Sequence, residues 1–464
     1  MDVVSRHARG VRRGAGTDPP GPGPIGSLGP LLSMCHDRIT PVASVLKRYG
    51  RIAMLEGAKG RVYLVNDPEA VQELLSGAHR DVMKDTGHQL FLRPVLGNGL
   101  LLNEGAAHLR RRRMMQPAFH SARIADYATT MVRYAVAAAG RWEAGQRIDV
   151  MREMMALALD VVGKTLFNSE VAEDKQGVAD AIEDIMQADS ILLHPLAPIL
   201  TRLPLRRVRR FRRAIRRLDA IVYRIIREHR AKGGGGDLLD MLMAARDEES
   251  GAPLGDEALR DEVLTLFLAG HETTANTMAW AWRLLGENPA VEARFHAEVD
   301  AAIGDRTPGM EDFALLPYTR QIVEETLRLY PPAYLFGREA LRPITILGYA
   351  IPAGSQVLLS PYVSHRDARF FPDPERFDPD RFAPEQRETR PRDAWFPFGA
   401  GPRKCIGERF AMMEAVLVLA TIGRRWRLAT EGQPRPGIDP RITLRPRGGL
   451  PMTVLPRETA SGSE

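Results

Sequence analysis

Residues 398–407 read FGAGPRKCIG, and this stretch is the most informative part of the sequence for the fold and the function. Cys405 sits in a tight loop with glycines on both sides, directly before an apolar helix, ERFAMMEAVLVLATIGRRW. Glycines accept unusual backbone angles and let a large flat group approach the backbone closely. Backbone N–H groups at a helix N-terminus can hydrogen-bond a thiolate, and Arg403 and Lys404 add positive charge. The pattern indicates a cysteine held ready for chemistry, with Phe398 placed to pack near its sulfur.

The composition is that of a folded globular protein. The 464 residues are 44% hydrophobic and 26% charged, and a chain of this length buries a large core. Lysine and arginine number 64 against 58 acidic residues, and 57 of the 64 are arginines spread along the chain. No zinc-finger spacing or basic stripe with interleaved aromatics accompanies them, which argues against nucleic-acid binding. Whole-chain disorder, a fibrous repeat and a disulfide-stapled mini-protein are excluded.

The cysteines and the N-terminus indicate the compartment. Cys35 and Cys405 cannot form a disulfide framework, so a reducing cytoplasm is the expected location. The basic N-terminus lacks the apolar stretch of a secretory signal. No run of about 18 apolar residues occurs, so no transmembrane helix is expected.

Hydrophobic periodicity predicts a mainly α chain with a smaller β portion. Residues 1–28 are rich in glycine, proline and arginine and are expected to form a flexible arm, with a C-terminal tail at 458–464. Between them the expected elements are a helix at 40–49, strands at 51–55 and 61–66, helices through 68–322, and short strands from 344 onward.

The segment 205–222, LRRVRRFRRAIRRLDAIV, predicts a very basic amphipathic helix. A surface helix with a solvated arginine face explains this pattern. The alternative is peripheral contact with an anionic membrane surface or with an acidic partner.

A second informative helix is expected at 256–285, where AGHETT at 269–274 interrupts apolar flanks. A glycine inside a helix costs about 1 kcal/mol relative to alanine, so it and the carboxylate of Glu272 need an explanation. Thr273 can bond back to the carbonyl of Ala269, which loosens the local helix and leaves room for a small ligand and water.

Residues 398–407 match the pattern F-x-x-G-x-R-x-C-x-G in full, and this run closely resembles the haem-binding loop of the cytochrome P-450 family. Glu325-Thr326-Leu327-Arg328 resembles the family's E-x-x-R, and Tyr330-Pro331-Pro332 follows it. Pro374-Glu375-Arg376-Phe377 resembles the segment that supplies a third buried partner, Arg376. The resemblance spans 29–457 and implies a single large domain with the P-450 fold.

The resemblance also implies the cofactor and the site. The cofactor would be a buried haem b, with the Cys405 thiolate as the ligand of its iron. AGHETT is similar to the family's oxygen-activating element, which makes Thr273 the hydroxyl that orients the oxygen-bound water and Glu272 the acid that feeds protons. The other cofactor-binding candidates, which include the propionate partners, are His108, Arg112, Arg338, Arg403 and Phe398.

A haem-thiolate monooxygenase needs two electrons from outside the chain. No Rossmann fingerprint occurs between a strand and a helix, so a separate ferredoxin or flavodoxin with its NAD(P)H reductase is implied as the electron source. The chain itself is expected to be a monomer. An acidic carrier could dock on a basic face formed by Arg110, Arg111, Arg113, Lys404 and Arg409. Ordinary surface charge explains each of these residues equally well.

The expected substrate is hydrophobic, a terpenoid, fatty acid or polyketide, oxidised by hydroxylation or epoxidation. By analogy the positions that face it are the loop from about 88 to 102, Phe267, Ala269, Gly270, Ala333, Tyr334, Leu335, Phe336, Leu450 and Met452. The alternatives are a peroxide-driven peroxygenase or haem isomerase, a non-enzymatic gas-binding haem protein, and a thiol hydrolase that pairs Cys405 with a histidine.

Overall fold

The computed structural model describes residues 18–34, 37–57, 60–168, 175–188, 191, 197–232, 236–246, 251–430 and 432–457. Cys35, residues 1–17 of the expected arm and the expected tail at 458–464 lie outside the described residues. Within the described ranges, no helix is long and apolar enough to cross a membrane.

Helices make up most of the described chain. Their bounds are α1 Gly23–Ser33, α2 Thr40–Tyr49, α3 Pro68–Gln72, α4 Thr86–Leu96, α5 Gly105–Met115, α6 Ser121–Gly140, α7 Val150–Phe167, α8 Lys175–Gln187, α10 Ala197–Leu200, α11 Arg206–Lys232, α12 Leu238–Ala244, α13 Asp256–Glu287, α14 Pro289–Ala302, α15 Pro317–Leu329, α16 Pro361–Ser364, α17 Pro384–Arg387 and α18 Glu408–Gly423.

The strands are short. Their bounds are β1 Ile52–Gly57, β2 Gly60–Val65, β3 Val82–Lys84, β4 Arg147–Asp149, β5 Phe336–Ala340, β6 Ile344–Ile346, β7 Tyr349–Ile351, β8 Gln356–Leu359, β9 Trp426–Ala429, β10 Ile438–Pro440, β11 Leu444–Pro446 and β12 Pro451–Pro456.

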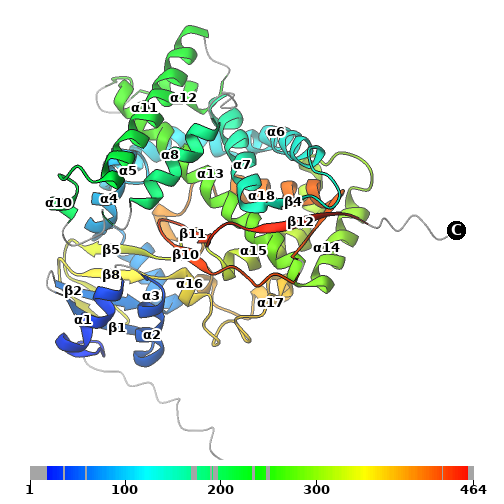
Figure 1. Ribbon diagram of the computed structural model, residues 1–464. Helices are drawn as coiled ribbons and strands as arrows, with labels where there is room; N and C mark the ends of the chain where they lie inside the picture. Colours follow the sequence, from blue (N-terminus) through cyan, green and yellow to red (C-terminus); the bar gives the residue numbers. More distant parts are fainter. Residues whose placement is uncertain are drawn as a thin grey trace, which may run out of the picture.

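The largest sheet has five strands in the order β1-β2-β8-β5-β3, and only the pair β2–β8 within it is parallel. It lies with α1, α2 and α3 at one side of the molecule, and most helices lie at the other (Figure 1). Two apolar clusters cover its two faces, while the largest cluster fills the helical part. The predicted mainly α class with a smaller β portion is therefore confirmed.

The local predictions near the N-terminus are partly confirmed. The helix expected at 40–49 is α2, and the two expected strands are β1 and β2, paired antiparallel. The flexible arm expected up to residue 28 is wrong for residues 23–28, because α1 begins at Gly23. The carbonyl of Pro20 accepts a hydrogen bond from the Met54 N–H at 3.0 Å, so this segment pairs with the exposed edge of β1.

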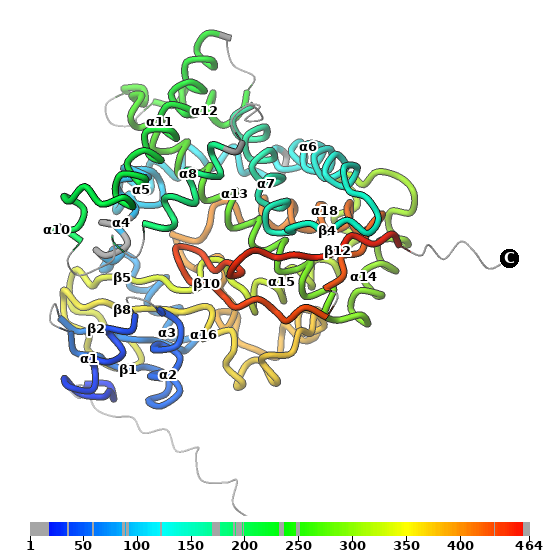
Figure 2. The backbone as a smooth tube through the Cα atoms, in the orientation of Figure 1, coloured from blue at the N-terminus to red at the C-terminus, as the bar shows by residue number. Residues whose placement is uncertain are grey.

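Helix α13 runs through the middle of the helical part and packs against α7, α11, α15 and α18 (Figure 2). Its residues from 259 to 267 and from 274 to 285 are buried, so these two parts of the helix are enclosed by protein. Trp280 is fully buried and stacks on Tyr330 with ring centroids 3.8 Å apart. The expected helix at 256–285 is confirmed, with its end at Glu287.

Glu325 and Arg328 form an ion pair with both side chains fully buried on α15. Arg328 Nε donates to Glu325 Oε2 at 2.6 Å, and Arg328 also donates to the carbonyls of His365, Pro374 and Arg376. The prediction that the Arg376 side chain completes this group is wrong, because Arg376 is exposed and contributes only its carbonyl. The short 3-10 helix at 379–382 packs on α15, and Arg381 Nε lies 3.5 Å from Glu325 Oε1 instead.

The basic helix predicted at 205–222 is α11, which continues to Lys232. Val208, Phe211 and Leu218 of its apolar stripe are buried, while the arginines between them face outward. Just before and at its start, Ile199, Leu203 and Leu205 are 59%, 43% and 37% exposed. The arginine face therefore borders exposed apolar side chains, but contact with a membrane stays a prediction.

Candidate active site

The loop that holds Cys405 is shaped by its glycines. The Cys405 N–H donates to the Phe398 carbonyl at 2.9 Å, which closes the loop before α18 begins. Gly399 and Gly401 adopt φ values of 71° and 66°, in the region that favours glycine. A Cβ on Gly401 would lie 2.0 Å from the Leu75 carbonyl oxygen, so no other residue fits there without moving the backbone. The loop backbone thus fixes where the sulfur lies.

The Cys405 side chain is exposed to a cavity inside the protein. Burial raises the pKa of its thiol, while a backbone hydrogen bond from Gly407 and the charges of Arg112 and Lys404 act in the opposite direction. The nearby Glu408 carboxylate also raises this pKa. A positive charge on the cavity side of the sulfur would lower the pKa of the thiol and favour the thiolate. The site therefore suits a metal cation bound to Cys405 from the cavity.

A single cavity of about 450 Å³ is lined by every residue that the sequence predicts for catalysis, for cofactor binding or as the metal ligand. Cys405 lines it from the α18 side, and α13 lines it with Ala269 and Gly270. The predicted site residues in its lining are His108, Arg112, Glu272, Thr273, Arg338, Phe398, Arg403 and Cys405. Positions up to 297 residues apart in sequence thus meet around one space.

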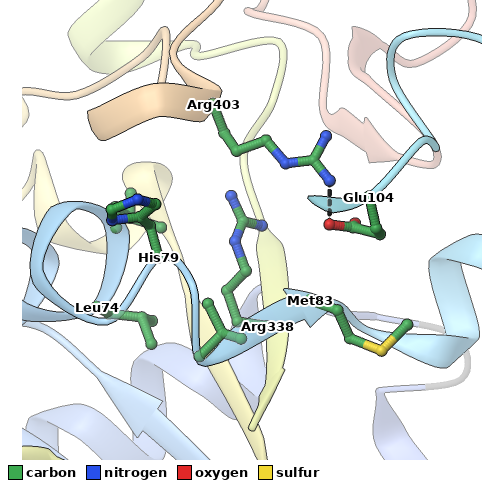
Figure 3. Close-up of a pocket in the computed structure, with 8 residues that line it drawn as sticks. Leu74, His79, Met83, Glu104, Arg338 and Arg403 are labelled. Atoms are coloured by element: carbon green, nitrogen blue, oxygen red, sulfur yellow. Dashed lines mark ion pairs between the residues drawn. The ribbon is translucent and has the colours of Figure 1, made fainter. Parts of the chain in front are cut away.

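Positive side chains crowd one part of this cavity. Arg112 Nη1 donates to the Lys404 carbonyl at 2.8 Å, and Arg403 forms an ion pair with Glu104. In Figure 3 the Arg338 side chain rises from its strand toward Arg403, which carries the Glu104 pair. Nη1 of Arg403 is buried and has no hydrogen-bond partner among the described residues. The cluster therefore holds more positive charge than its own acidic partners neutralise.

The pKa values reflect this excess of positive charge. Burial first, and then the charges of Arg403, Lys84 and Arg112, lower the pKa of His108 to about 3. Burial and Arg403 lower the pKa of Arg338 to about 10. A buried anionic group in the cavity would relieve both effects, because it would pair with the crowded cations. The cluster is suited to bind carboxylates.

The sequence analysis missed Lys84, which belongs to the same cluster. Lys84 ends β3 and pairs in register with Arg338 of β5, and its side chain lines the cavity. Burial and the charges of Arg403 and Arg338 lower its pKa well below the ordinary value. A lone lysine before an aspartate carries no distinctive signal, and only the strand pairing places it beside Arg338.

Helix α13 presents its threonines as the sequence predicts. Thr273 Oγ1 donates to the Ala269 carbonyl at 2.7 Å, which confirms the expected back-bond. Thr274 makes the same bond to the Gly270 carbonyl at 3.0 Å. Gly270 and Thr273 both line the cavity, and a Cβ on Gly270 would lie 3.1 Å from Val162 Cγ2 of α7. This arrangement leaves an open surface on α13 across from Cys405.

Glu272 is buried and held by two residues that the sequence analysis did not single out. Its Oε1 accepts hydrogen bonds from Thr443 Oγ1 and, at 2.8 Å, from Arg445 Nε. Arg445 also contacts the half-exposed Glu183 of α8 at 3.2 Å. The carboxylate thus lies in a charged chain that leads from the cavity wall to the surface. Thr443 and Arg445 lie more than 170 residues from Glu272, so no local sequence pattern predicts that they contact it.

The rest of the cavity wall is apolar. Of the loop predicted at about 88–102, six residues contribute to it: Leu92, Val95, Leu96, Leu100, Leu101 and Leu102. The predicted Ala333, Leu335 and Phe336 also contribute. Four predicted positions do not line it and are corrections: Phe267, Tyr334, Leu450 and Met452. Their side chains are buried elsewhere, as when the Tyr334 hydroxyl donates to the Pro440 and Arg441 carbonyls. The wall that the sequence missed comes from Leu166 and from Ile182, Ile185 and Met186 of α8.

Comparisons with known proteins identify a family and several relatives that this chain matches over most of its length. The family model described as cytochrome P450 matches residues 19–451. Cyclooctatin synthase of Streptomyces melanosporofaciens is 41% identical over 446 residues, which cover 94% of this chain and 93% of that protein. Cyclooctat-9-en-7-ol 5-monooxygenase of the same organism is 38% identical, covering 94% and 95%. Pentalenene oxygenase of Streptomyces avermitilis is 34% identical, covering 88% and 91%.

Proposed function

Because this chain belongs to the cytochrome P450 family and is a monooxygenase, we propose that it binds haem b through the Cys405 thiolate and oxidises a terpenoid. The observation that carries this proposal is the single cavity in which Cys405, Thr273 and the cationic cluster meet. Residues 29–457 act as one domain under this proposal, because the cavity lining runs from Lys84 to Thr443.

The residues present fit a haem. Cys405 would ligate the iron, and the Phe398 ring lines the cavity beside it. The unpartnered Nη1 of Arg403 and the lowered pKa of His108 are accounted for if propionates occupy the cluster. The propionate partners would be Lys84, His108, Arg112, Arg338 and Arg403. When bound, haem with a thiolate ligand supplies the activation of O₂ needed to insert one oxygen atom into a C–H or C=C bond.

Protons enter from the α13 side under this proposal. The hydroxyl of Thr273 donates to the Ala269 carbonyl, so its oxygen lone pairs are free to accept a hydrogen bond from water in the cavity. Glu272 holds or releases a proton at its carboxylate, and Arg445 links it to Glu183 near the surface. If the Glu272 carboxylate turned between Arg445 and water in the cavity, it would carry protons inward without opening the cavity to bulk water.

The substrate is proposed from the cavity wall and from the relatives. Apart from the cations at one end and the polar groups of α13, the lining is mostly apolar, and leucine, isoleucine, methionine and phenylalanine supply its large side chains. Such a wall selects an apolar ligand by shape and not by hydrogen bonds. The names of two relatives contain cyclooctat-9-en-7-ol and pentalenene, which are mostly hydrocarbon. We infer that the substrate of this chain is a similar terpenoid.

Electrons come from a separate ferredoxin or flavodoxin. Three basic residues suit an acidic carrier: Lys404 lies in the Cys405 loop, Arg409 follows it in the first turn of α18, and Arg113 is exposed on α5. Arg111, predicted on the same face, points inward instead and lies 3.5 Å from the buried Glu262. Turnover by purified protein with a ferredoxin, its reductase, NADPH and O₂ tests the electron requirement.

A titration of the haem-loaded ferric protein tests the substrate. We expect terpenes to produce a low-to-high-spin shift, while fatty acids and macrolides leave the spectrum unchanged. A shift with fatty acids or macrolides alone would contradict the terpenoid proposal. Equal product yield with peroxide alone and with the electron chain would contradict the requirement for a redox partner.

A further inference from the structure

The loop at 97–102, between α4 and α5, is fastened to α13 by two carboxylates. The Asn98 N–H donates to Asp261 Oδ2 at 2.7 Å. The Leu100 N–H donates to Glu262 Oε2 at 2.8 Å. Asp261 and Glu262 are adjacent in sequence, and their carboxylates accept hydrogen bonds from loop N–H groups that are two residues apart. This pair of helix residues therefore sets the path of the loop.

Glycines let the loop approach α13 this closely. A Cβ on Gly97 would lie 2.1 Å from a carboxylate oxygen of Asp261, and Gly97 has a φ of 54°. A Cβ on Gly99 would lie 2.1 Å from Thr265 Oγ1 and 2.7 Å from the Asp261 carbonyl. The loop backbone therefore packs closely against α13 and against its Asp261 and Thr265 side chains.

The other side of the loop faces the cationic cluster. Lys84 Nζ donates to the Leu101 carbonyl at 2.5 Å, and Arg403 donates to the Asn103 carbonyl at 2.5 Å. Leu100, Leu101 and Leu102 line the cavity next to these two attachments. The loop is thus a wall of the cavity held from α13 and from the cofactor side.

The carboxylates have their own partners behind the loop. Arg260 donates to Asp261 at 2.9 Å and also pairs with Asp219 of α11. Glu262 is fully buried, and its Oε1 has no hydrogen-bond partner among the described residues, although Arg111 Nε lies 3.5 Å away. Burial raises the pKa of Glu262 to about 7, with the Leu100 bond and Arg111 opposing this rise and Asp261 adding to it.

We propose that Asp261 and Glu262 are positioning residues whose hydrogen bonds to Asn98 and Leu100 hold the 97–102 loop closed as a wall of the substrate cavity. The importance of that wall for selectivity rests on the proposed function. The fastening itself rests on the geometry alone, so it is tested without turnover.

Hydrogen exchange of the haem-loaded protein measures the fastening directly. The peptide that contains residues 97–102 is followed in the wild type, Asp261→Asn, Glu262→Gln and Glu262→Leu. Removing the carboxyl acceptor of this buried hydrogen bond should speed exchange at Leu100 about 10-fold in Glu262→Leu. Glu262→Gln keeps an acceptor oxygen and should show a smaller increase. Glu257→Gln is the matched control, because Glu257 lies on the same helix but is exposed.

Two results would overturn the proposal. One is loop exchange in Glu262→Leu no faster than in Glu257→Gln. The other is acceleration spread evenly over α13 and α5, which indicates general loosening of the fold. If Glu262→Leu fails to fold, the isosteric Glu262→Gln carries the test, with exchange equal to the wild type as the contrary result.

A second measurement separates a positioning role from a merely structural one. The probes are imidazole and 4-phenylimidazole, followed by the Soret shift as they enter the haem-loaded protein. A loosened loop should speed entry of the bulky probe about fivefold in Glu262→Leu while imidazole entry stays within twofold. Equal acceleration of both probes, or of neither, would contradict control of the cavity wall by Glu262. A normal thiolate-type carbon monoxide spectrum shows in each variant that the haem site is intact.

Discussion

Replacing Arg328 with alanine should destabilise the protein more than almost any surface change. Arg328 is fully buried and makes five hydrogen bonds, two to the Glu325 carboxylate and three to backbone carbonyls. Removing one partner of a buried ion pair costs about 3–5 kcal/mol, because the other charge stays buried and unpaired. Against a total stability of about 5–15 kcal/mol, this loss leaves little margin for a folded, haem-retaining protein.

The pH dependence of the variant gives an independent check. Burial already raises the pKa of Glu325, and Arg328 is the strongest influence that lowers it. Without Arg328 the folded-state pKa rises further, so protonation of Glu325 recovers stability at low pH. That contribution is present below the unfolded-state pKa and is lost as the pH rises through the folded-state pKa. The deficit should therefore be larger at pH 8 than at pH 5.

Urea unfolding followed by tryptophan fluorescence and haem absorbance measures the loss. Arg328→Lys keeps the charge but cannot reproduce the two-pronged contact, so its loss should be intermediate. Arg320→Ala on the exposed side of the same helix is the control and should stay within about 0.5 kcal/mol of the wild type. A loss below about 1 kcal/mol for Arg328→Ala would refute the reasoning.

Three further predictions follow from the site and the surface. Thr273→Ala should retain haem but release reducing equivalents as hydrogen peroxide, with product per electron falling by roughly 10-fold; unchanged coupling counts against its role. Glu262→Gln should flatten the pH dependence of stability: the folded-state pKa of Glu262 is raised from 4.5 to about 7, so its contribution is present below pH 4.5 and lost as the pH rises through 7. An equal slope in both proteins refutes this assignment. If the α11 face binds anionic lipid, changing Arg206, Arg209 and Arg213 to glutamine should weaken sedimentation with phosphatidylglycerol vesicles by about 1 kcal/mol per arginine. No binding by the wild type excludes that alternative.

Local sequence features predicted the parts of the site that depend on neighbouring residues. The Cys405 loop, the Thr273 back-bond and the bounds of α2 need only spacing, glycine and periodicity. The errors arise where one segment packs on another. Arg376 and Arg381 are both arginines near the same turn, and only the packing of the 3-10 helix at 379–382 on α15 selects Arg381.

The residues that sequence reasoning missed share the same cause. Lys84 reaches the cationic cluster through the pairing of β3 with β5. Arg445 reaches Glu272 across 173 residues of chain. Asp261 and Glu262 look like ordinary acids in the first turns of a helix until the loop amides at Asn98 and Leu100 are placed against them. Such contacts depend on tertiary register, which a single sequence does not display.

The most direct test of the account is the carbon monoxide difference spectrum of the reduced, haem-loaded protein, wild type against Cys405→Ser. We predict a thiolate-type spectrum for the wild type and its loss in Cys405→Ser, with haem still retained by the cationic cluster. A thiolate-type spectrum that persists in Cys405→Ser, or that never forms in the wild type, would contradict Cys405 as the ligand and with it the proposed chemistry.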